Sequence, residues 1–216
     1  MRVVSLQVGQ PDTQTYFGKA VRTSGHKMPV AAAHLHRLDF EGNAQADLKN
    51  HGGADKAACV YSFDHYAYWE KELGVTLTPG AFSENLTIAG IREAEVCIGD
   101  VFRVGEARVQ ISQPRGPCSK LAGRFGRKDL PDKIHANGFS GFYFRVLDEG
   151  LVRVNDAVEL IARHPQGVTI EFANQVMYKH RTDAESLERV LAVEVLSAVW
   201  REALEKRRAK GEEREA

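Results

Sequence analysis

Hydrophobic and polar positions alternate with a period of two along the first three quarters of the chain. Residues 3–8, 107–111 and 141–147 show this pattern most clearly, and it is typical of strands that bury one face. Turn sequences such as Gly99-Asp100 separate the runs. We therefore predict a mainly β domain over residues 1–165, as part of an α+β chain.

One helix is predicted among these strands, at residues 64–74. Asp64 stands where an N-cap is expected and Gly74 where a helix commonly ends. Tyr66 and Trp69 lie inside this helix, and we assign them to packing rather than to function.

Beyond residue 165 the period changes to 3.6, which favours helices in residues 166–216. One helix face carries Phe172, Ala173, Val176, Met177 and His180. A capping box at residues 182–185 and a cap at Ser197 open two further helices. Because a three-helix bundle of this size is marginal alone, we expect it to pack on the β domain or on a second subunit. A homodimer is one open assembly.

Composition limits the kinds of partner. The 216 residues are 43% hydrophobic and 27% charged, with a formal net charge of zero, so the chain can bury one good core and a small second unit. No basic excess favours nucleic acid or an acidic membrane surface, although a local patch could bind a small anion.

The cysteines and the N-terminus bear on location. Cys59, Cys97 and Cys118 are odd in number and far apart, which fits a reducing compartment better than a disulfide framework. The start of the chain lacks the apolar stretch of a signal peptide, and no segment has the roughly 18 apolar residues of a membrane-spanning helix. These features predict a soluble cytoplasmic protein without a membrane partner.

The loop after the strand at 107–111 has the strongest chemical character. Two prolines and a glycine shape the sequence around Cys118, and Arg115 and Lys120 place two positive charges near its sulfur. Neighbouring cations favour the thiolate form of cysteine, which is both a nucleophile and a soft metal ligand. We therefore expect Cys118 to lie at the functional site rather than to fill a turn.

A second candidate stretch contains the double glycine Gly52-Gly53. Glycine permits backbone angles and close ligand approach that other residues do not. His51, Asp55 and Lys56 surround the pair with polar side chains, although Asp55 and Lys56 alone would be consistent with a solvated turn.

Two further pairs of polar residues are candidates. Glu84 and Asn85 follow a Gly/Pro-initiated loop and could either read the hydrogen-bonding edge of a heterocycle or serve as turn residues. Tyr143 and Arg145 are two apart in a predicted strand and would face the same side; Arg145 is interpreted as an ion-pair or anion-binding residue.

His34 and His36 alternate with Leu35 and would share one face of a strand. Two histidines placed in this way could begin a metal site. The sequence nearby offers no third ligand at a useful spacing, so the pattern alone does not support one.

Five motifs in order resemble the MOSC domain, the module at the C-terminus of molybdenum cofactor sulfurases. They are His51-Gly52-Gly53-Ala54-Asp55-Lys56-Ala57, Phe82-Ser83-Glu84-Asn85-Leu86, Cys97-Ile98-Gly99-Asp100, Gln113-Pro114-Arg115-Gly116-Pro117-Cys118-Ser119-Lys120-Leu121 and Gly141-Phe142-Tyr143-Phe144-Arg145-Val146-Leu147. With the helical tail, the chain is similar to the stand-alone YiiM type. The resemblance implies a barrel-like, mostly antiparallel β domain with its core at about 30–162. Ser83 departs from the family pattern, which usually has glycine there.

The same resemblance implies that the chain binds molybdenum cofactor, with Cys118 as sulfur carrier or molybdenum ligand. Related members reduce N-hydroxylated compounds such as N-hydroxylated purine bases, without pyridoxal phosphate. Because no ferredoxin-like cysteine cluster is present, electrons would come from a separate reductase. We expect cofactor contacts from His51, Asp55, Lys56, Glu84, Asn85, Arg115, Lys120, Tyr143 and Arg145.

Two alternatives remain open at this point. A non-catalytic carrier would hold cofactor or a persulfide on Cys118 and pass it on. A cysteine hydrolase would pair Cys118 with His51 or His135 and would need an oxyanion hole.

Overall fold

The computed structural model describes the backbone of residues 1–215 and the side chains of residues 1–48 and 51–210. Its main sheet contains β1 (Arg2–Val8), β4 (Met28–Val30), β6 (Ala58–Ser62), β7 (Leu86–Ala89), β8 (Val101–Val104), β9 (Ala107–Pro114), β10 (Phe142–Asp148) and β12 (Val158–Ala162). The strand order is β12-β8-β9-β10-β6-β7-β1-β4. Neighbours pair antiparallel except β6 and β7, which are parallel. The chain thus has a mixed α+β fold built on a large, mainly antiparallel sheet.

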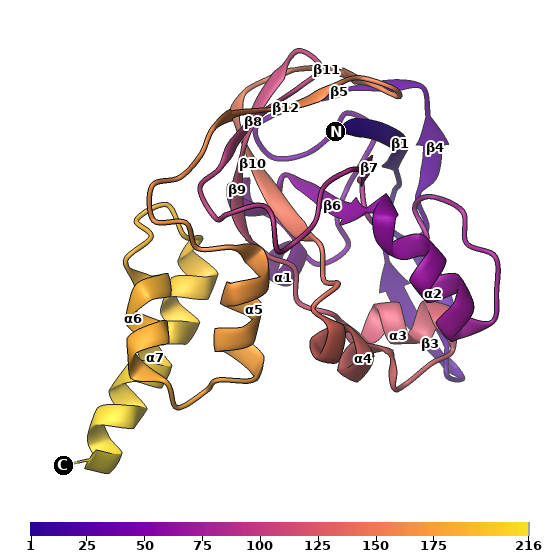
Figure 1. Ribbon diagram of the computed structural model, residues 1–216. Helices are drawn as coiled ribbons and strands as arrows, with labels where there is room; N and C mark the ends of the chain where they lie inside the picture. The colour runs from indigo at the N-terminus through magenta and orange to yellow at the C-terminus, as the bar shows by residue number, and fades with distance from the viewer. Residues whose placement is uncertain (216) are drawn as a thin grey trace.

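The sheet curves until its two ends approach each other (Figure 1). The amide of Val3 in β1 donates to the carbonyl of Asp156 at 3.0 Å, and that of Asn155 donates to the carbonyl of Val3 at 2.9 Å, just before β12. The ladder pairings of the described strands nevertheless leave β12 and β4 as edges. The predicted barrel-like closure is therefore not confirmed.

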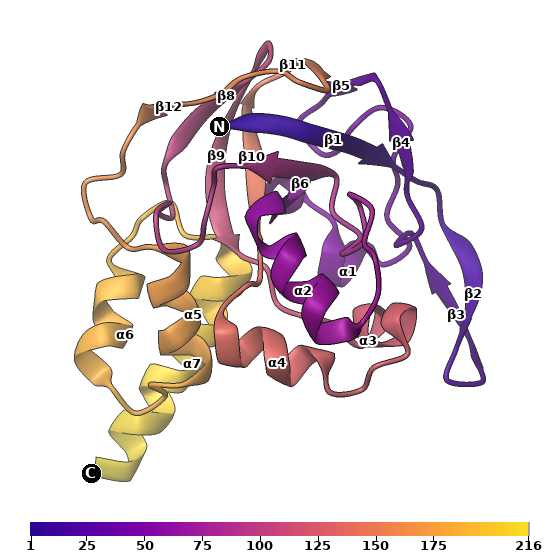
Figure 2. The same cartoon turned by 45° about the vertical axis from the view of Figure 1, so that its right-hand side comes forward.

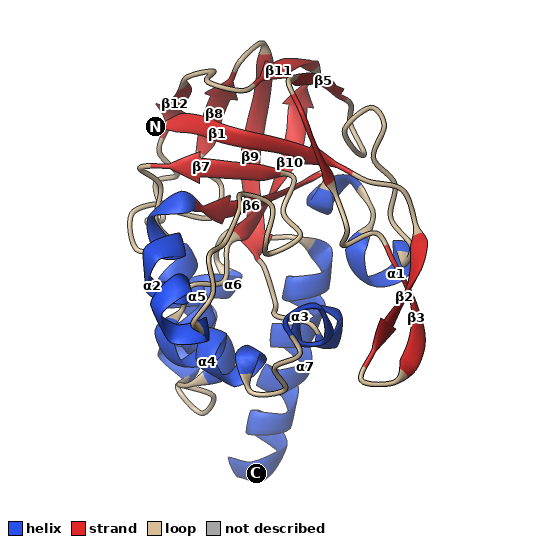
Figure 3. Ribbon diagram, turned by 90° about the vertical axis from the view of Figure 1, so that its right-hand side faces the viewer, coloured by secondary structure: helices blue, strands red, loops and turns tan. Residues whose placement is uncertain are grey.

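Two small ribbons flank the main sheet. β2 (Asp12–Tyr16) and β3 (Lys19–Thr23) form a hairpin that extends from the body of the molecule (Figure 2). β5 (Ala32–Leu35) pairs antiparallel with β11 (Gly150–Arg153). In Figures 1 and 3 this second ribbon lies at the end of the sheet away from α3 (Ser119–Phe125).

Short helices gather near the other end of the sheet. They are α1 (Leu48–His51), the 3-10 turns Ala54–Lys56 and Phe63–His65, α2 (Tyr66–Leu73), α3 and α4 (Leu130–Asn137). The structure contains the helix expected at 64–74 and its Gly74 end, with φ of 69°. The predicted Asp64 cap is wrong: Ser62 accepts the hydrogen bond at the helix start, while the Asp64 carboxylate accepts from the Gly90 amide and Arg92.

An aromatic cluster fills the space between α2, α3 and α4. It comprises Tyr61, Tyr66, Trp69, Ala81, Phe82, Leu121, Leu130 and Ile134. Trp69 is fully buried and donates to the Tyr61 hydroxyl at 2.6 Å. The assignment of Tyr66 and Trp69 to packing is confirmed.

The C-terminal helices are α5 (Ile170–Tyr178), α6 (Ala184–Leu191) and α7 (Ala198–Glu215). The side chains of Thr169, Asp183 and Ser197 accept the hydrogen bonds that open them. Their apolar faces share one continuous core with the sheet, with Trp200 and Leu204 among its members. The helices thus pack on the β domain, one of the two predicted possibilities; residue 216 of the predicted unit lies outside the described chain.

None of the described helices is long and apolar enough to cross a membrane.

Candidate functional site

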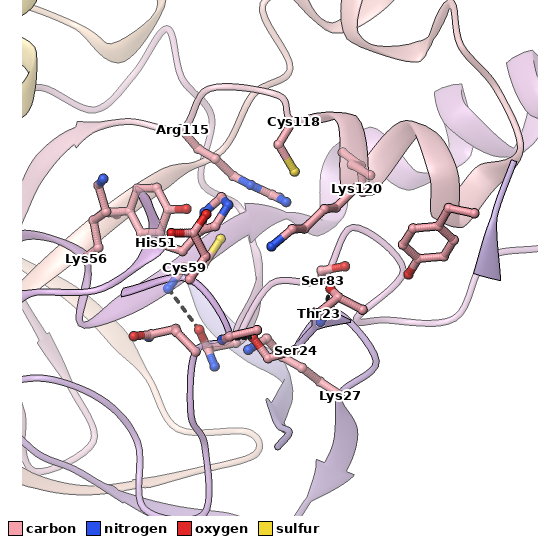
Figure 4. A pocket seen from close by; sticks show the side chains of 18 residues that line it. Thr23, Ser24, Lys27, His51, Lys56, Cys59, Ser83, Arg115, Cys118 and Lys120 are labelled. Carbon is pink, nitrogen blue, oxygen red and sulfur yellow. Dashed lines mark hydrogen bonds between the residues drawn. The ribbon is translucent and has the colours of Figure 1, made fainter. Parts of the chain in front are cut away.

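A cavity of about 680 Å³, including its open mouth, lies where the β9–α3 loop, α1 and the 79–85 loop meet. It is lined by Tyr16, Thr23, Ser24, Gly25, Lys27, Gln45, Ala46, Asp47, His51, Lys56, Cys59, Ser83, Asn85, Arg115, Cys118, Lys120, Leu121 and Tyr143. Figure 4 shows the side chains of Arg115, Cys118 and Lys120 converging on this space from the β9–α3 segment.

Cys118 stands at the junction of β9 and α3, as predicted from the strand pattern. It is the N-cap residue of α3, with extended backbone angles, and it is partly exposed. The helix α3 that follows Cys118 packs directly on Tyr16 of β2. A side chain at Gly123 would not fit there, because its Cβ would lie 2.6 Å from the Tyr16 ring. Arg124 also donates to the carbonyl of Gly25 at 2.6 Å. These contacts fix the cysteine loop against the β2–β3 hairpin.

Arg115 is a buried cation of the cavity, at 7% exposure, the same fraction as Lys56. Its Nη2 donates to the carbonyl of Phe82 at 2.6 Å, while Nη1 is buried without a partner in the described chain. Burial by itself would lower the pKa of the guanidinium, but the neighbouring Cys59, Tyr143 and Cys118 outweigh it and raise the pKa. The group is therefore a permanent buried charge with spare donor capacity.

Three lysines add to this positive charge. Burial lowers the pKa of both Lys27 and Lys56, and Lys27 also donates to Asn43 at 2.8 Å. Lys120 lines the same cavity from α3. Because an anion favours the protonated form of a nearby lysine, a cavity with these residues is suited to a negatively charged ligand.

His51 lies in the cavity as a neutral imidazole at pH 7. Burial first, and then the charges of Arg115 and Lys120, lower its pKa to about 4. An imidazolium–thiolate pair, as in cysteine hydrolases, would have to form against these two cations. His135, the alternative base, lies outside the cavity and stacks on Tyr178 with ring centroids 4.0 Å apart.

Cys59 and Tyr143 face each other across β6 and β10. Both line the cavity, and burial raises the pKa of each. Asn85 also reaches the cavity wall, but its side chain accepts from the Cys59 amide at 3.1 Å and donates to the Gln7 carbonyl at 3.1 Å. The Asn85 side chain thus links β1 to β6. The sequence analysis predicted a ligand contact for Asn85 but not this structural role.

Glu84 does not line the cavity. Its Oε1 accepts from the hydroxyls of Tyr66 and Thr87, at 2.5 and 2.6 Å, and from the amide of Gly80 at 3.0 Å. We call these four residues the Glu84 network. It holds the loop that presents the Phe82 carbonyl to Arg115, so Glu84 supports the site from outside the cavity lining. Its Oε2 is buried without a partner in the described chain, and the expected cofactor contact of Glu84 stays a prediction.

Asp55 and Arg145 also lie outside the cavity lining, contrary to the predicted cofactor contacts. They form an ion pair of 2.6 Å. The ion-pair interpretation of Arg145 is therefore confirmed, and its partner is another residue that had been expected to bind the cofactor.

Ser83 adopts a left-handed backbone with φ of 63°. This conformation favours glycine, which is the residue the family pattern usually has there. Gly53, with φ of 98° and ψ of 164°, shows that the double-glycine stretch also needs such freedom.

Several cavity residues were missed in the sequence. Lys27, Thr23 and Ser24 come from the polar N-terminal segment, and Cys59 lies within a buried strand. None carries a local motif, and only the packing of α3 on the hairpin brings the first three to the cysteine. Lys27 is the most important residue that the sequence analysis did not identify, because a lone lysine in a polar segment is typical of a solvated side chain.

Family models identify the two parts of the chain. A model of the MOSC domain matches residues 47–159, and one of the YiiM-like, 3-alpha helix domain matches residues 168–211. The chain belongs to the MOSC domain family. Protein YflK of Bacillus subtilis (strain 168) is 48% identical to this MOSC protein over 207 residues, which cover 95% of this chain and 94% of YflK.

Other relatives extend the match. Protein YiiM of Escherichia coli (strain K12) is 37% identical over 180 residues, 82% of this chain and 80% of YiiM. The crystal structure of YiiM from Geobacillus stearothermophilus superposes with a TM-score of 0.81 at 38% identity and covers 95% of this chain and 97% of that one. A Gibberella moniliformis (strain M3125 / FGSC 7600) protein named Reductase is 33% identical over 117 residues, 52% of this chain and 21% of that protein.

Proposed function

We propose that this MOSC protein binds molybdenum cofactor and reduces N-hydroxylated compounds, such as N-hydroxylated purine bases, with electrons from a separate reductase. One observation carries the proposal: the partly exposed Cys118 opens into a cavity that gathers Arg115, Lys27, Lys56 and Lys120. A soft sulfur ligand beside several cations suits a group that combines a metal with a phosphate. The fungal relative named Reductase supports an oxidoreductase.

The residues present fit such a group. The unpartnered Nη1 of Arg115 needs an acceptor, and a phosphate oxygen is one. Lys27 and Lys56 lose hydration on burial, so a bound anion would stabilise their charged forms. Lys120 and Lys27 line the cavity and would provide the cationic phosphate contact that was expected from Arg145.

When bound, the cofactor would supply a molybdenum centre able to remove oxygen from an N-hydroxylated compound. Cys118 would hold the metal through its sulfur. Arg115 and the lysines would bind the phosphate and neutralise its charge. His51, neutral at pH 7 because of its lowered pKa, can donate one hydrogen bond and accept another within the cavity. The Glu84 network keeps the Phe82 carbonyl in place for Arg115.

A non-catalytic carrier of sulfur or molybdenum cofactor is the second candidate. The observation that favours it is the second thiol, Cys59, which lines the same cavity as Cys118. A carrier would hold its cargo on Cys118 and pass it on without an electron donor.

The test is to produce the protein in cells that synthesise molybdenum cofactor and to measure molybdenum, pterin and reductase activity in wild type, Cys118→Ser and Cys97→Ala. Cys97 is buried away from the cavity, beside Arg163, and serves as the matched control. We expect Cys118→Ser to abolish molybdenum binding and turnover with the fold intact, and Cys97→Ala to retain both.

The other outcomes separate the candidates. Bound cofactor without turnover, in the presence of several electron-donating reductases and N-hydroxylated bases, would favour the carrier. Full activity in Cys118→Ser would exclude Cys118 as a metal ligand.

A further inference from the structure

The β5–β11 ribbon carries three metal-ligating side chains on its outer face. His34 and His36 come from the chain of β5 and its end, and Glu149 directly precedes β11. One donor atom of each residue lies within 4.8 Å of those of the other two. The ribbon lies at the end of the sheet away from α3 (Figures 1 and 3), so the cluster is separate from the cavity around Cys118.

Strand pairing places these residues together. In the antiparallel register Leu35 pairs with Gly150 and His34 with Leu151, so His36 and Glu149 are the next opposing pair. Leu35 and Gly150 lie on the buried face of the ribbon, whereas His36 and Glu149 are exposed. Since side chains alternate along a strand, His34 shares the outer face with both.

The carboxylate is oriented toward the histidines. The amide of Arg37 donates to Glu149 Oε1 at 2.8 Å, and Oε2 lies 3.5 Å from His36 Nδ1. A glutamate carboxylate is ordinarily ionised at neutral pH, so Glu149 offers an anionic ligand. The two imidazole rings lie with their centroids 4.5 Å apart.

We propose that His34, His36 and Glu149 bind a divalent transition-metal cation, with Zn²⁺ as the best match. Ligand atoms bonded to zinc at about 2.0–2.1 Å in a tetrahedron are roughly 3.3 Å apart, so the His36–Glu149 distance already suits a shared metal. The ligand atom of His34, which lies within 4.8 Å of the other two, would have to move closer to them to complete the tetrahedron. A set of two imidazoles and one carboxylate prefers zinc, nickel, cobalt or copper to magnesium or calcium.

The alternative is an ordinary surface ion pair between His36 and Glu149. Exposed pairs of this kind contribute little, and such a pair leaves His34 with only its ring contact to His36. Among the described residues, the His34 imidazole makes no hydrogen bond, so a shared metal is the arrangement that uses all three side chains. The bound metal would join β5 to the β10–β11 turn and leave coordination positions open to water.

The test is zinc titration calorimetry on the full chain without an affinity tag, in a Cys118→Ser background that removes the exposed thiol of the cavity. We expect one zinc equivalent, with affinity lowered at least tenfold in His34→Ala and His36→Ala. Glu149→Gln, which keeps the side-chain shape, should also weaken binding, and the thermal midpoint of the background should rise with zinc. His180→Ala, at an exposed histidine outside the cluster, should behave like the background.

Absence of zinc binding in the background would overturn the proposal. So would an isotherm in folded His34→Ala or His36→Ala that equals that of His180→Ala. Circular dichroism of each variant establishes that it is folded.

Discussion

The cavity around Cys118 and the Glu84 network beside it both bury ionisable groups, but they use them differently. In the network, the Glu84 carboxylate accepts three hydrogen bonds from the protein itself. In the cavity, the buried Arg115 lies with three lysines around open space, and its Nη1 has no partner in the described chain.

The difference separates structural polar residues from ligand-binding ones. Unpaired buried charge is costly, so a site that keeps several like charges together is stable only if the fold supplies the energy or a ligand relieves the repulsion. In the Glu84 network all three donors meet at Oε1, whereas Oε2 is buried without a partner in the described chain. The network therefore stabilises its own loop through one carboxylate oxygen. Two adjacent residues of one motif differ in position in the same way: Ser83 lines the cavity, whereas Glu84 lies outside its lining.

Glu84→Ala tests the structural side and has the largest expected effect. It would leave the Tyr66 and Thr87 hydroxyls without their carboxylate acceptor and the Gly80 amide with only the Tyr66 hydroxyl as acceptor, and should destabilise the protein by about 3–5 kcal/mol. Differential scanning calorimetry should show the melting temperature falling by about 10 °C. Glu84→Gln, which retains an acceptor oxygen, should lose less.

The structural role of Glu84 would be contradicted if Glu84→Ala had the melting temperature of the wild type but no longer bound the cofactor. Glu84 would then contact the ligand directly. Glu95→Ala, at an exposed glutamate, is the control for a change of charge alone.

His51 tests the electrostatics of the cavity through pH. Its pKa is about 4 in the folded protein and 6.5 ordinarily, so between these values the unfolded chain binds the proton and the folded chain does not. Stability should therefore fall as pH falls from about 6.5 to about 4, by about 2 kcal/mol after allowance for solvent screening. Urea unfolding at several pH values measures it.

His51→Gln should remove this component of the pH dependence, whereas His180→Gln, at an exposed histidine, should preserve it. An unchanged profile in His51→Gln would mean that the cations of the cavity do not act on this imidazole.

Ser83→Gly has the smallest expected effect on the free energy of unfolding, and it should raise that free energy instead of lowering it. Glycine relieves the left-handed backbone strain at this position but loses more entropy on folding, so the net gain should be about 0.5–1 kcal/mol. Gly80→Ser is the matched reverse change: with φ of 92° and a Cβ that would lie 2.7 Å from Gln7, it should destabilise. A loss of stability in Ser83→Gly would indicate that the serine hydroxyl has a structural role.

Much of this arrangement could be predicted locally. The position of Cys118 after a strand follows from the alternation in residues 107–111, and the cap at Ser197 follows from short-range hydrogen-bonding chemistry. The capping box predicted at 182–185 is displaced by one residue, because Asp183 and not Thr182 caps α6. These features depend on neighbours within a few residues, so the sequence alone contains them.

The partners of the polar motif residues could not be predicted in this way. Asp55 and Arg145 were expected to face a cofactor, yet they face each other across 90 positions. Glu149, which completes the cluster with His34 and His36, is likewise remote from them in the sequence. Pattern and spacing specify which face of a strand a side chain occupies, but not which strand lies opposite.

The amino-acid sequence by itself determined the strand-rich and helical parts, the reactive loop around Cys118 and the family resemblance, because periodicity, capping and motifs are short-range properties. Only the tertiary structure decided that Lys27 joins the cavity, that Glu84 Oε1 accepts hydrogen bonds from Tyr66, Thr87 and Gly80, and that the three-helix unit packs on the sheet. Each of these depends on the long-range strand register and on buried hydrogen bonds, where distant residues compete to satisfy the same polar groups.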